Sequence, residues 1–274
     1  MRRRCCNSSQ ANSRASTAIG SMKKQCFSAQ APRADMASGD VVICDDQDRL
    51  AQRAAAFVAE RINQARPPHR FLLALTGGST PAATYRQLAT MDVDWSRTHF
   101  LLSDERCVPL DDENSNYRMA FENLLGRIPV GESQIHPVRT ELSPEAAAED
   151  YESLLRSLGD AELPAIDLVL LGLGSDGHTA SLFPAQPEVE EHDRLVLATR
   201  AALATGGGPM RRVTFTLPLI NAARGAAFIA AGTEKASTVS AALGAGSRPS
   251  VPAARVRPPG GVTWLLDKAA AAEL

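Results

Sequence analysis

Short apolar runs alternate with helix-like segments along most of this chain. Runs of four to seven mostly apolar residues favour buried strands, and they occur at 41–44, 71–75, 98–102, 166–172, 195–199, 213–217, 226–230 and 262–265. Helical periodicity or helix-start residues mark the segments at 47–65, 82–90, 118–125 and 144–158. This alternation predicts an α/β fold of three layers (αβα), in which helices cover both faces of a mainly parallel, Rossmann-like sheet.

The most informative motif begins where the run at 166–172 ends. It contains Gly174-Ser175-Asp176-Gly177-His178. In open α/β sheets ligands bind outside the carboxyl ends of the strands, and glycines let a ligand approach the backbone. A histidine at that rim, two residues after an aspartate, suits proton transfer near neutral pH. The alternative is a loop histidine that only packs or caps.

The run at 71–75 also ends in glycines, in the turn Thr76-Gly77-Gly78-Ser79-Thr80. Thr80 is a typical N-cap and Pro81 suits a first helical position, so a helix is expected to begin here. Free N–H groups and the helix dipole would then form an anion site. The turn is neither a Walker A loop nor a GxGxxG motif. A plain strand–helix turn without a ligand is the alternative.

A third strand end carries charged residues. The run at 98–102 leads into Ser103-Asp104-Glu105-Arg106. On an extended chain Asp104 and Arg106 share one face. A simple ion pair at the strand end is the alternative to a functional role. The polar segment at 114–117 then starts the next predicted helix.

These three motifs, in this order and spacing, resemble the 6-phosphogluconolactonases. That family carries a TGGSTP-like turn, an SDER segment followed by SNY, and a GxGxDGHTASLFP signature, all nearly unbroken here. Later pieces also match, at 211–218, 221–224, 232–236 and 264–267. The resemblance runs from about residue 41 to the C-terminus. Its most specific part is DGHTASLFP, whereas the TGG turn is shared with sugar-phosphate isomerases and deaminases.

The resemblance implies hydrolysis of 6-phospho-D-glucono-1,5-lactone to 6-phospho-D-gluconate, the second step of the oxidative pentose phosphate pathway. A lactone is an activated ester, so His178 as general base would suffice to deprotonate the water. Asp104 or Asp176 would orient the imidazole ring or bind substrate hydroxyls. The backbone at Gly77 and Gly78 would supply donors to the oxyanion. No cofactor and no metal is expected.

The phosphate requires cations. Arg106 is the first candidate, Arg211 or Arg212 the second and Lys235 the third. The residues of the glycine turn, Thr76 to Thr80, are expected to line the same substrate site. One departure concerns the segment at 204–210, where the family often has a lysine with prolines and this chain has no lysine, so that Arg211 would serve instead. Each single cation could instead be a solvated surface charge.

Two other functional classes remain as alternatives. Glucosamine-6-phosphate deaminases share the fold, the TGG turn and a DGH element, but their DGH typically leads into Ile-Ala-Phe-Asn-Glu-Pro. The segment at 179–184 lacks that Asn-Glu pair. An inactive sugar-phosphate-binding module would be expected to lack His178 or Asp104, and both are present.

The first 36 residues differ from the rest. They are rich in arginine and serine and contain one acid, Asp35, which is the composition of an organelle transit peptide. We expect a disordered leader at 1–36 and one catalytic domain at 37–274, located in a plastid, with the cytoplasm or a mitochondrion as alternatives. The plastid preference rests on the pathway that the family serves. A basic tail without a targeting role is the other interpretation.

The composition of the chain argues against some classes of binding partner. The chain has 274 residues, is 44% hydrophobic and contains no apolar run long enough for a membrane span. The leader holds seven of the 29 basic residues and one of the 31 acidic ones, so the remainder has a net charge of −8. An acidic body argues against nucleic acid as a partner. We therefore expect a small sugar-phosphate lactone as substrate and a monomer or a homodimer. Two body cysteines, Cys44 and Cys107, set no disulfide framework.

Overall fold

The computed structural model describes residues 40–66, 68–158, 165–200, 203–204, 209–244 and 251–274. The predicted leader at 1–36 lies outside the described residues, so its assignment stays a prediction. All elements below belong to the unit that comes after it in the chain.

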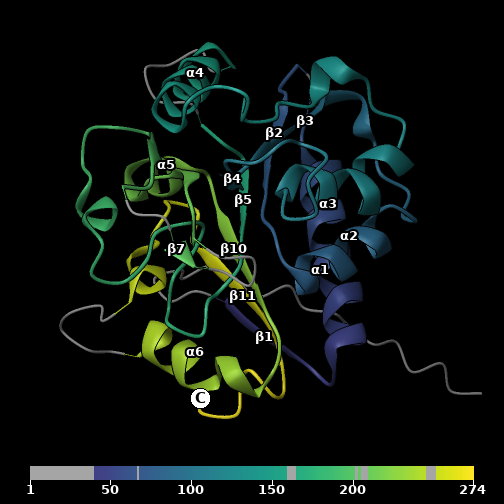
Figure 1. Cartoon of the computed structure of the whole chain (residues 1–274). Helices are drawn as coiled ribbons and strands as arrows, with labels where there is room; N and C mark the ends of the chain where they lie inside the picture. Colours follow the sequence, from purple (N-terminus) through teal and green to yellow (C-terminus); the bar gives the residue numbers. More distant parts are fainter. Residues whose placement is uncertain (1–39, 67, 159–164, 201–202, 205–208, 245–250) are drawn as a thin grey trace, which may run out of the picture. The chain divides into compact units, whose positions relative to one another are not determined.

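A six-stranded parallel sheet forms the centre (Figure 1). In spatial order its strands are β1 (Asp40–Cys44), β11 (Val262–Asp267), β10 (Ala226–Ala230), β5 (Leu168–Leu171), β2 (Phe71–Leu75) and β3 (Thr98–Leu102). Every neighbouring pair is parallel. The predicted α/β class with a mainly parallel sheet is confirmed.

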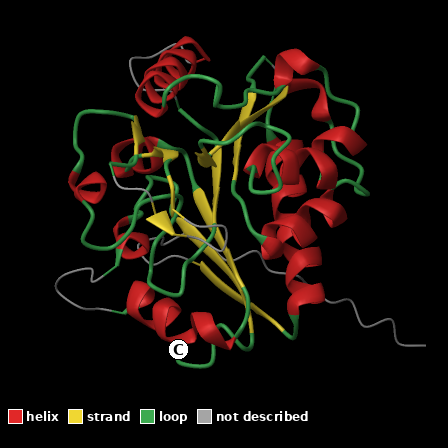
Figure 2. Cartoon of the chain, in the orientation of Figure 1, coloured by secondary structure: helices red, strands yellow, loops and turns green. Residues whose placement is uncertain are grey.

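Helices pack on both faces of this sheet (Figure 2). One face carries α1 (Gln47–Gln64), α2 (Ser79–Leu88) and α3 (Asn116–Asn123), and the other carries α4 (Pro144–Leu158), α5 (Leu217–Ala222) and α6 (Ala236–Leu243). The alternation of side chains along each strand makes this possible. On β2, for example, Leu73 packs with the first group of helices, whereas Leu72 packs with the second.

A second, antiparallel sheet contains strands that the sequence placed in the parallel series. Its order is β4 (Asp104–Arg106), β9 (Arg212–Phe215) and β6 (Val196–Ala198). The runs predicted as strands at 195–199 and 213–217 belong here, because an apolar run indicates burial but not strand direction. The 213–217 run is also cut short, since Thr216 caps α5 through its side chain. A two-stranded ribbon, β7 (Leu203–Ala204) and β8 (Pro209–Met210), completes the strands described.

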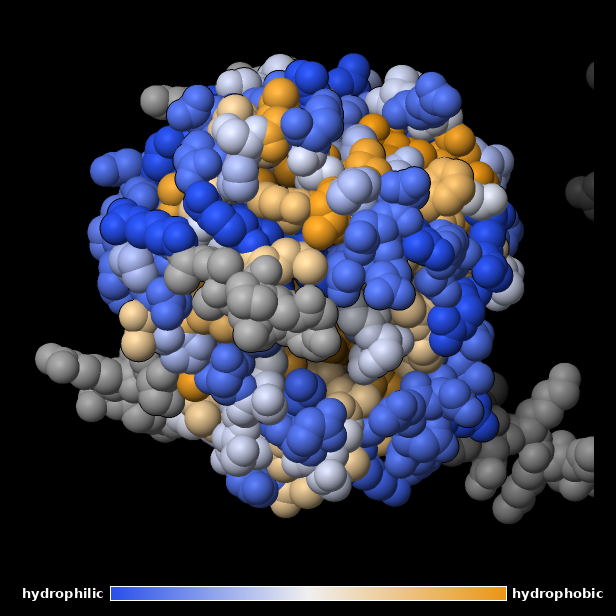
Figure 3. All heavy atoms as spheres, in the orientation of Figure 1, coloured by the Kyte–Doolittle hydropathy of each residue, from blue (hydrophilic) through white to orange (hydrophobic). Residues whose placement is uncertain are grey.

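Short 3₁₀ helices connect several of these elements. These helices are Trp95–Arg97, Leu125–Arg127, Glu132–Gln134, Pro187–Glu190, Thr233–Lys235 and Pro252–Arg255. On the face shown in Figure 3, hydrophilic residues cover most of the described surface and hydrophobic ones lie in patches between them. Every helix in the described part of the chain is too short or too polar to cross a membrane.

The strand order favours a ligand site at the carboxyl ends of β2 and β5. From β2 the chain continues outward to β3, and from β5 it continues the opposite way to β10 and then β11. Neighbouring connections that leave in opposite directions open a crevice at the carboxyl ends of the two strands. The glycine turn follows β2 and the DGH motif follows β5.

A histidine pair ties the edge strand β3 to the loop that follows α3. His99 on β3 stacks on His136, with ring centroids 5.3 Å apart, and its Nδ1 lies 3.0 Å from His136 Nε2. The backbone N–H of His136 also donates to the Phe100 carbonyl at 2.9 Å. Burial, then the nearby His99 and Arg70, lower the pKa of His136 to about 4.

This pair predicts a loss of stability in mild acid. The pKa of His136 is near 6.5 in the unfolded chain, so the unfolded state takes up more protons between about pH 6.5 and 4. The wild type should therefore lose stability relative to His136→Gln as the pH falls through this window. Because the ring is partly exposed, the difference should stay below about 1.4 kcal/mol per pH unit. Denaturant unfolding at several pH values measures it, and parallel curves for the two proteins would contradict this account.

Candidate active site

Most of the predicted site residues follow the carboxyl ends of four neighbouring strands of the parallel sheet. Lys235 follows β10, Asp176 and His178 follow β5, Gly77 and Gly78 follow β2, and Asp104 to Arg106 follow β3. Since β10, β5, β2 and β3 are neighbours in this order, the strand that leads to His178 lies between the strand that leads to Lys235 and the strand that leads to Arg106.

The glycine turn ends in an uncapped helix. Gly78, at φ 113°, is the N-cap of α2, and the helix begins at Ser79 without a side-chain cap. The prediction of Thr80 as N-cap was wrong by two residues, because the left-handed conformation of Gly78 already turns the chain into the helix. Gly78 and Ser79 are exposed, and the N–H groups of Gly77 and Gly78 have no partner among the described residues. Such an end suits an anion.

His178 and Asp176 form a pair at the rim of the crevice. The Nδ1 atom of His178 lies 2.6 Å from Asp176 Oδ1, and the backbone N–H of His178 donates to the same oxygen at 3.1 Å. Burial alone would raise the pKa of Asp176, but its contacts with the backbone and ring of His178 hold it below the ordinary value. The Nε2 atom has no partner within the described residues and is free for a ligand or water.

Gly174 makes room for this pair. A Cβ atom there would lie 2.1 Å from His178 Nδ1 and 2.5 Å from Asp176 Oδ1. No Cβ tolerates such distances, so a side chain would push the imidazole away. Gly172, two residues earlier, has ordinary space, with its nearest atom, Thr76 Oγ1, at 3.8 Å.

Asp104 belongs to a buried polar cluster behind the rim. It is 5% exposed and accepts a hydrogen bond from the Ser181 hydroxyl at 2.6 Å. Arg212, 2% exposed, donates to the same hydroxyl at 3.3 Å and lies 3.9 Å from the Asp104 carboxylate. Burial lowers the pKa of Arg212, although Asp104 opposes the shift. Of the two aspartates proposed to orient the ring, Asp176 contacts His178, whereas Asp104 binds Ser181 in the turn that follows it.

Asn116 was missed by the sequence analysis. Its side-chain amide donates to the Asp104 carbonyl at 2.8 Å and to the carboxylate at 3.2 Å. A Cβ on Gly77 would lie 2.0 Å from Asn116 Oδ1, so the amide fills the space beside the glycine turn. Asn116 therefore joins two of the predicted motifs. The SNY segment was the available signal, but it was interpreted as a helix start and as a family motif, with no role given to Asn116.

Glu105 was also left without a role, and it anchors α3. Its fully buried carboxylate accepts the backbone N–H groups of Arg106, Asn116 and Tyr117 at 2.7–2.8 Å. The Ser115 hydroxyl donates to it at 3.1 Å. Burial raises the pKa of Glu105, and these donors oppose the rise. The carboxylate thus caps the helix and fixes it to β4.

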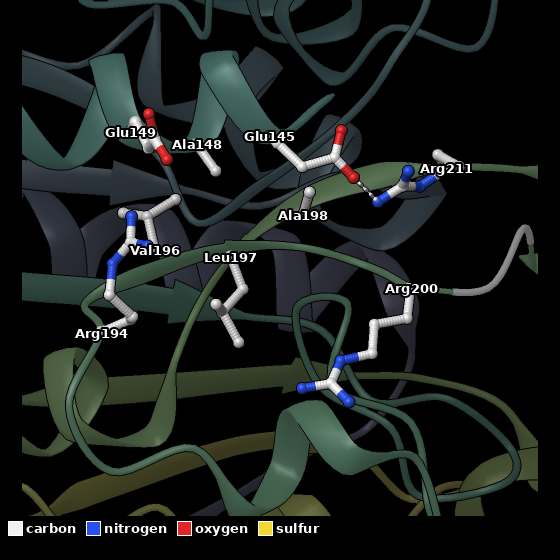
Figure 4. Close-up of a pocket in the computed structure, with 9 residues that line it drawn as sticks. All are labelled: Glu145, Ala148, Glu149, Arg194, Val196, Leu197, Ala198, Arg200 and Arg211. Atoms are coloured by element: carbon white, nitrogen blue, oxygen red, sulfur yellow. Dashed lines mark ion pairs between the residues drawn. The ribbon is translucent and has the colours of Figure 1, made fainter. Parts of the chain in front are cut away.

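Two candidate arginines, Arg212 at the start of β9 and Arg211 just before it, point in opposite directions. Arg211, unlike Arg212, forms an ion pair with Glu145 of α4 at 2.7 Å and donates to the Thr199 carbonyl at 2.6 Å (Figure 4). It lines a separate pocket of about 400 Å³ with Arg194 and Arg200. Neighbouring residues of an extended segment face opposite sides, so Arg211 and Arg212 cannot both face the same site, and the phosphate role expected of Arg211 stays a prediction.

The remaining candidate cations, Arg106 and Lys235, differ in their hydrogen bonds and ion pairs. Arg106 pairs with Arg212 in the register of the antiparallel sheet and donates to the Asn114 carbonyl at 2.6 Å. Its Nε atom is buried and has no hydrogen-bond partner in the described structure. Lys235 forms no ion pair with the described residues. Thr76 is 4% exposed, and its backbone exchanges hydrogen bonds of 2.9 Å with the Tyr85 hydroxyl, so it supports the turn from inside.

No group of three or more histidine, cysteine, aspartate or glutamate side chains is arranged to hold a metal within the described ranges. The arrangement offers a histidine with a free ring nitrogen among the described residues, backbone N–H donors and flanking cations.

The chain is similar to known proteins over most of its length. The family model described as glucosamine-6-phosphate isomerases/6-phosphogluconolactonase matches residues 45–265. A 6-phosphogluconolactonase of Synechocystis is 39% identical over 86% of this chain and 97% of its own length. The chloroplastic 6-phosphogluconolactonase 3 of Arabidopsis thaliana is 33% identical over 85% of this chain and 75% of its own length.

Solved structures show the same fold. The 6-phosphogluconolactonase of Trypanosoma brucei superposes with a TM-score of 0.77 at 31% identity, covering 86% of this chain and 99% of that one. A monomeric glucosamine-6-phosphate deaminase superposes with a TM-score of 0.72 at 25% identity, covering 86% and 100%. The fold by itself therefore does not separate the two activities.

Alanine variants of Gly174 and Gly172 form a matched pair that tests this steric role. Gly174→Ala should displace His178 from Asp176 and lower the turnover of the lactone about a hundredfold, as expected when a base is misplaced. Gly172→Ala should stay within about threefold of wild type, because its methyl group meets only ordinary contacts. Kinetics with thermal melting of both variants measure this. Equal turnover in the two variants would overturn the steric argument.

Proposed function

This chain belongs to the glucosamine-6-phosphate isomerase/6-phosphogluconolactonase family, and we propose that it hydrolyses 6-phospho-D-glucono-1,5-lactone to 6-phospho-D-gluconate with His178 as general base. The observation that carries this proposal is the His178–Asp176 pair at the crevice between β5 and β2, beside the uncapped start of α2. Base and backbone donors come from neighbouring strand ends.

The His178–Asp176 pair supports Nε2 as the nitrogen that acts. Asp176 accepts the Nδ1 proton of His178, so the lone pair lies on Nε2. Nε2 takes one proton from a water as the water oxygen attacks the lactone carbonyl carbon. The result is a tetrahedral intermediate and an imidazolium, which the Asp176 carboxylate stabilises.

The intermediate collapses when the ring C–O bond breaks. The N–H groups of Gly77 and Gly78 stabilise the negative oxygen before this step. His178 returns its proton to the departing ring oxygen, which becomes the 5-hydroxyl of the product. The carboxylic acid that forms then loses its proton to solvent, and the enzyme regains a neutral imidazole.

The phosphate is assigned first to Arg106. Its buried Nε lacks a partner in the described structure, and an anion would satisfy it. Arg212 is committed to Asp104 and Ser181. Lys235, on the other side of His178, is the second candidate.

The deaminase alternative is disfavoured on one observation. The residues after His178 form a tight turn packed on Asp104 through Ser181, and no Asn-Glu pair stands at 179–184. The acid that usually assists ring opening and amine release in deaminases is missing there.

Loss of the base tests the proposal. His178→Asn should lower kcat by about a hundredfold or more, since a positioned general base contributes that much. The melting temperature should stay close to wild type, because the side chain is at the rim and 28% exposed. Turnover near wild type, above spontaneous hydrolysis, would transfer the role of base to another group.

Two lactones separate phosphate binding from catalysis. Arg106→Gln should weaken the apparent affinity for the phosphorylated lactone by about 10- to 150-fold, the effect of losing a charge-assisted pair. It should hardly change the slow turnover of unphosphorylated gluconolactone, which offers no anion.

Lys235→Gln is the matched control for the opposite side of the crevice. Equal proportional losses on both lactones in Arg106→Gln, with a phosphate-selective loss in Lys235→Gln, would move the phosphate to Lys235.

We further propose that residues 1–36 are a transit peptide that directs the protein to a plastid. The composition supports this, as does the similarity to a chloroplastic relative. A fusion of 1–36 to a fluorescent reporter should enter plastids, and a protein starting at residue 37 should keep full lactonase activity. Diffuse cytosolic or mitochondrial fluorescence would refute the plastid assignment.

A further inference from the structure

The signature continues past His178 as a tight turn. Thr179 and Leu182 exchange backbone hydrogen bonds of 3.3 and 2.9 Å, and Ala180 between them has φ 48°. A non-glycine residue in this region carries backbone strain, which persists only where the surroundings enforce it. The turn reverses the chain and returns Phe183 to His178, with the ring centroids 4.3 Å apart and the planes inclined by 26°.

The imidazole is therefore held from several directions. Gly174 lies against its Nδ1–Cε1 edge, Asp176 binds Nδ1, and Phe183 stacks on its face. Among the described residues, the ring so enclosed has one polar atom without a partner, Nε2. Without the stacked ring, the histidine could leave Asp176 by rotating about its side-chain bonds, since a hydrogen bond at the rim competes with water.

Phe183 is itself fixed by the buried cluster. The guanidinium carbon of Arg212 lies 5.5 Å from the Phe183 ring centroid, a cation–π distance. Ser181, at the centre of the turn, is bound to Asp104 and to Arg212. Its backbone N–H also donates to the Thr214 hydroxyl at 3.0 Å. Both the turn and the aromatic ring thus rest on the same group of residues.

We propose that Phe183 is a positioning residue for His178, and that the Asp104–Ser181–Arg212 cluster acts on the base through it. The proposal rests on the proposed function, in which His178 is the base. It gives the aromatic residue at the end of the signature a role in the orientation of the imidazole.

The chain offers a matched control. Phe57 on α1 is half-buried like Phe183 and also has an arginine above its ring, Arg61 at 5.3 Å, but it has no histidine beside it. Phe183→Leu and Phe57→Leu therefore remove the same ring and the same type of cation contact. Phe183→Tyr keeps the aromatic face.

Steady-state kinetics, melting curves and ¹⁵N NMR of the five histidines test the proposal. Phe183→Leu should lower kcat about tenfold with KM within about twofold, as loss of orientation predicts. Phe57→Leu should keep the wild-type kcat, and Phe183→Tyr should recover most of it. The ¹⁵N shifts of His178 should show one tautomer in the wild type and an average of two in Phe183→Leu.

Unchanged kcat and unchanged His178 shifts in folded Phe183→Leu would overturn the positioning role. Equal losses in Phe57→Leu would also overturn it. If Phe183→Leu fails to fold, Phe183→Met replaces it as an apolar, non-aromatic variant. A wild type without lactonase activity would refute the proposed function instead, and the His178 shifts would still decide whether Phe183 holds the ring.

Discussion

Asp104 and Arg212 carry opposite charges in the protein interior, where their side chains are 6% and 3% exposed, and the candidate site is built around them. Removing one partner of a buried pair leaves an uncompensated charge, typically at a cost of about 3–5 kcal/mol. Ser181 bridges the two groups and Asn116 binds the aspartate from α3. The pairing therefore sets the positions of β4, β9, α3 and the turn after His178. The reacting atoms lie on a more exposed layer supported by this buried one.

This division explains how one fold serves different reactions. A deaminase and several lactonases superpose on the chain, so the parallel sheet and its crevice do not select the chemistry. We infer that the residues after the DGH element make this selection. Here the segment at 179–184 turns back, buries Ser181 and places Phe183 on the histidine. A segment that presents a second acid at the same point would serve amine release instead of water activation.

The sequence predicted the layered fold and the motifs that meet at one edge, because apolar runs and glycine turns are local signals. It did not predict that β6 and β9 leave the parallel sheet, since burial gives no strand direction. It also could not decide between Arg211 and Arg212, adjacent residues whose opposite directions depend on the register with β4. Thr80 was chosen as a cap by residue preference, whereas Gly78 caps the helix by conformation. Asn116 and Glu105 act through hydrogen bonds between β4 and the start of α3, which lie 10 to 12 residues apart in the sequence. No local pattern displays such bonds.

Lactone hydrolysis and amine release can be compared on one preparation of the protein. A single purified preparation would be offered 6-phospho-D-glucono-1,5-lactone, with 6-phosphogluconate measured by a coupled dehydrogenase, and in parallel glucosamine 6-phosphate, with ammonia measured. The account predicts lactone hydrolysis well above the spontaneous rate and no ammonia above background. Ammonia release without accelerated lactone hydrolysis would contradict it, because the crevice beside His178 would then serve the deaminase reaction.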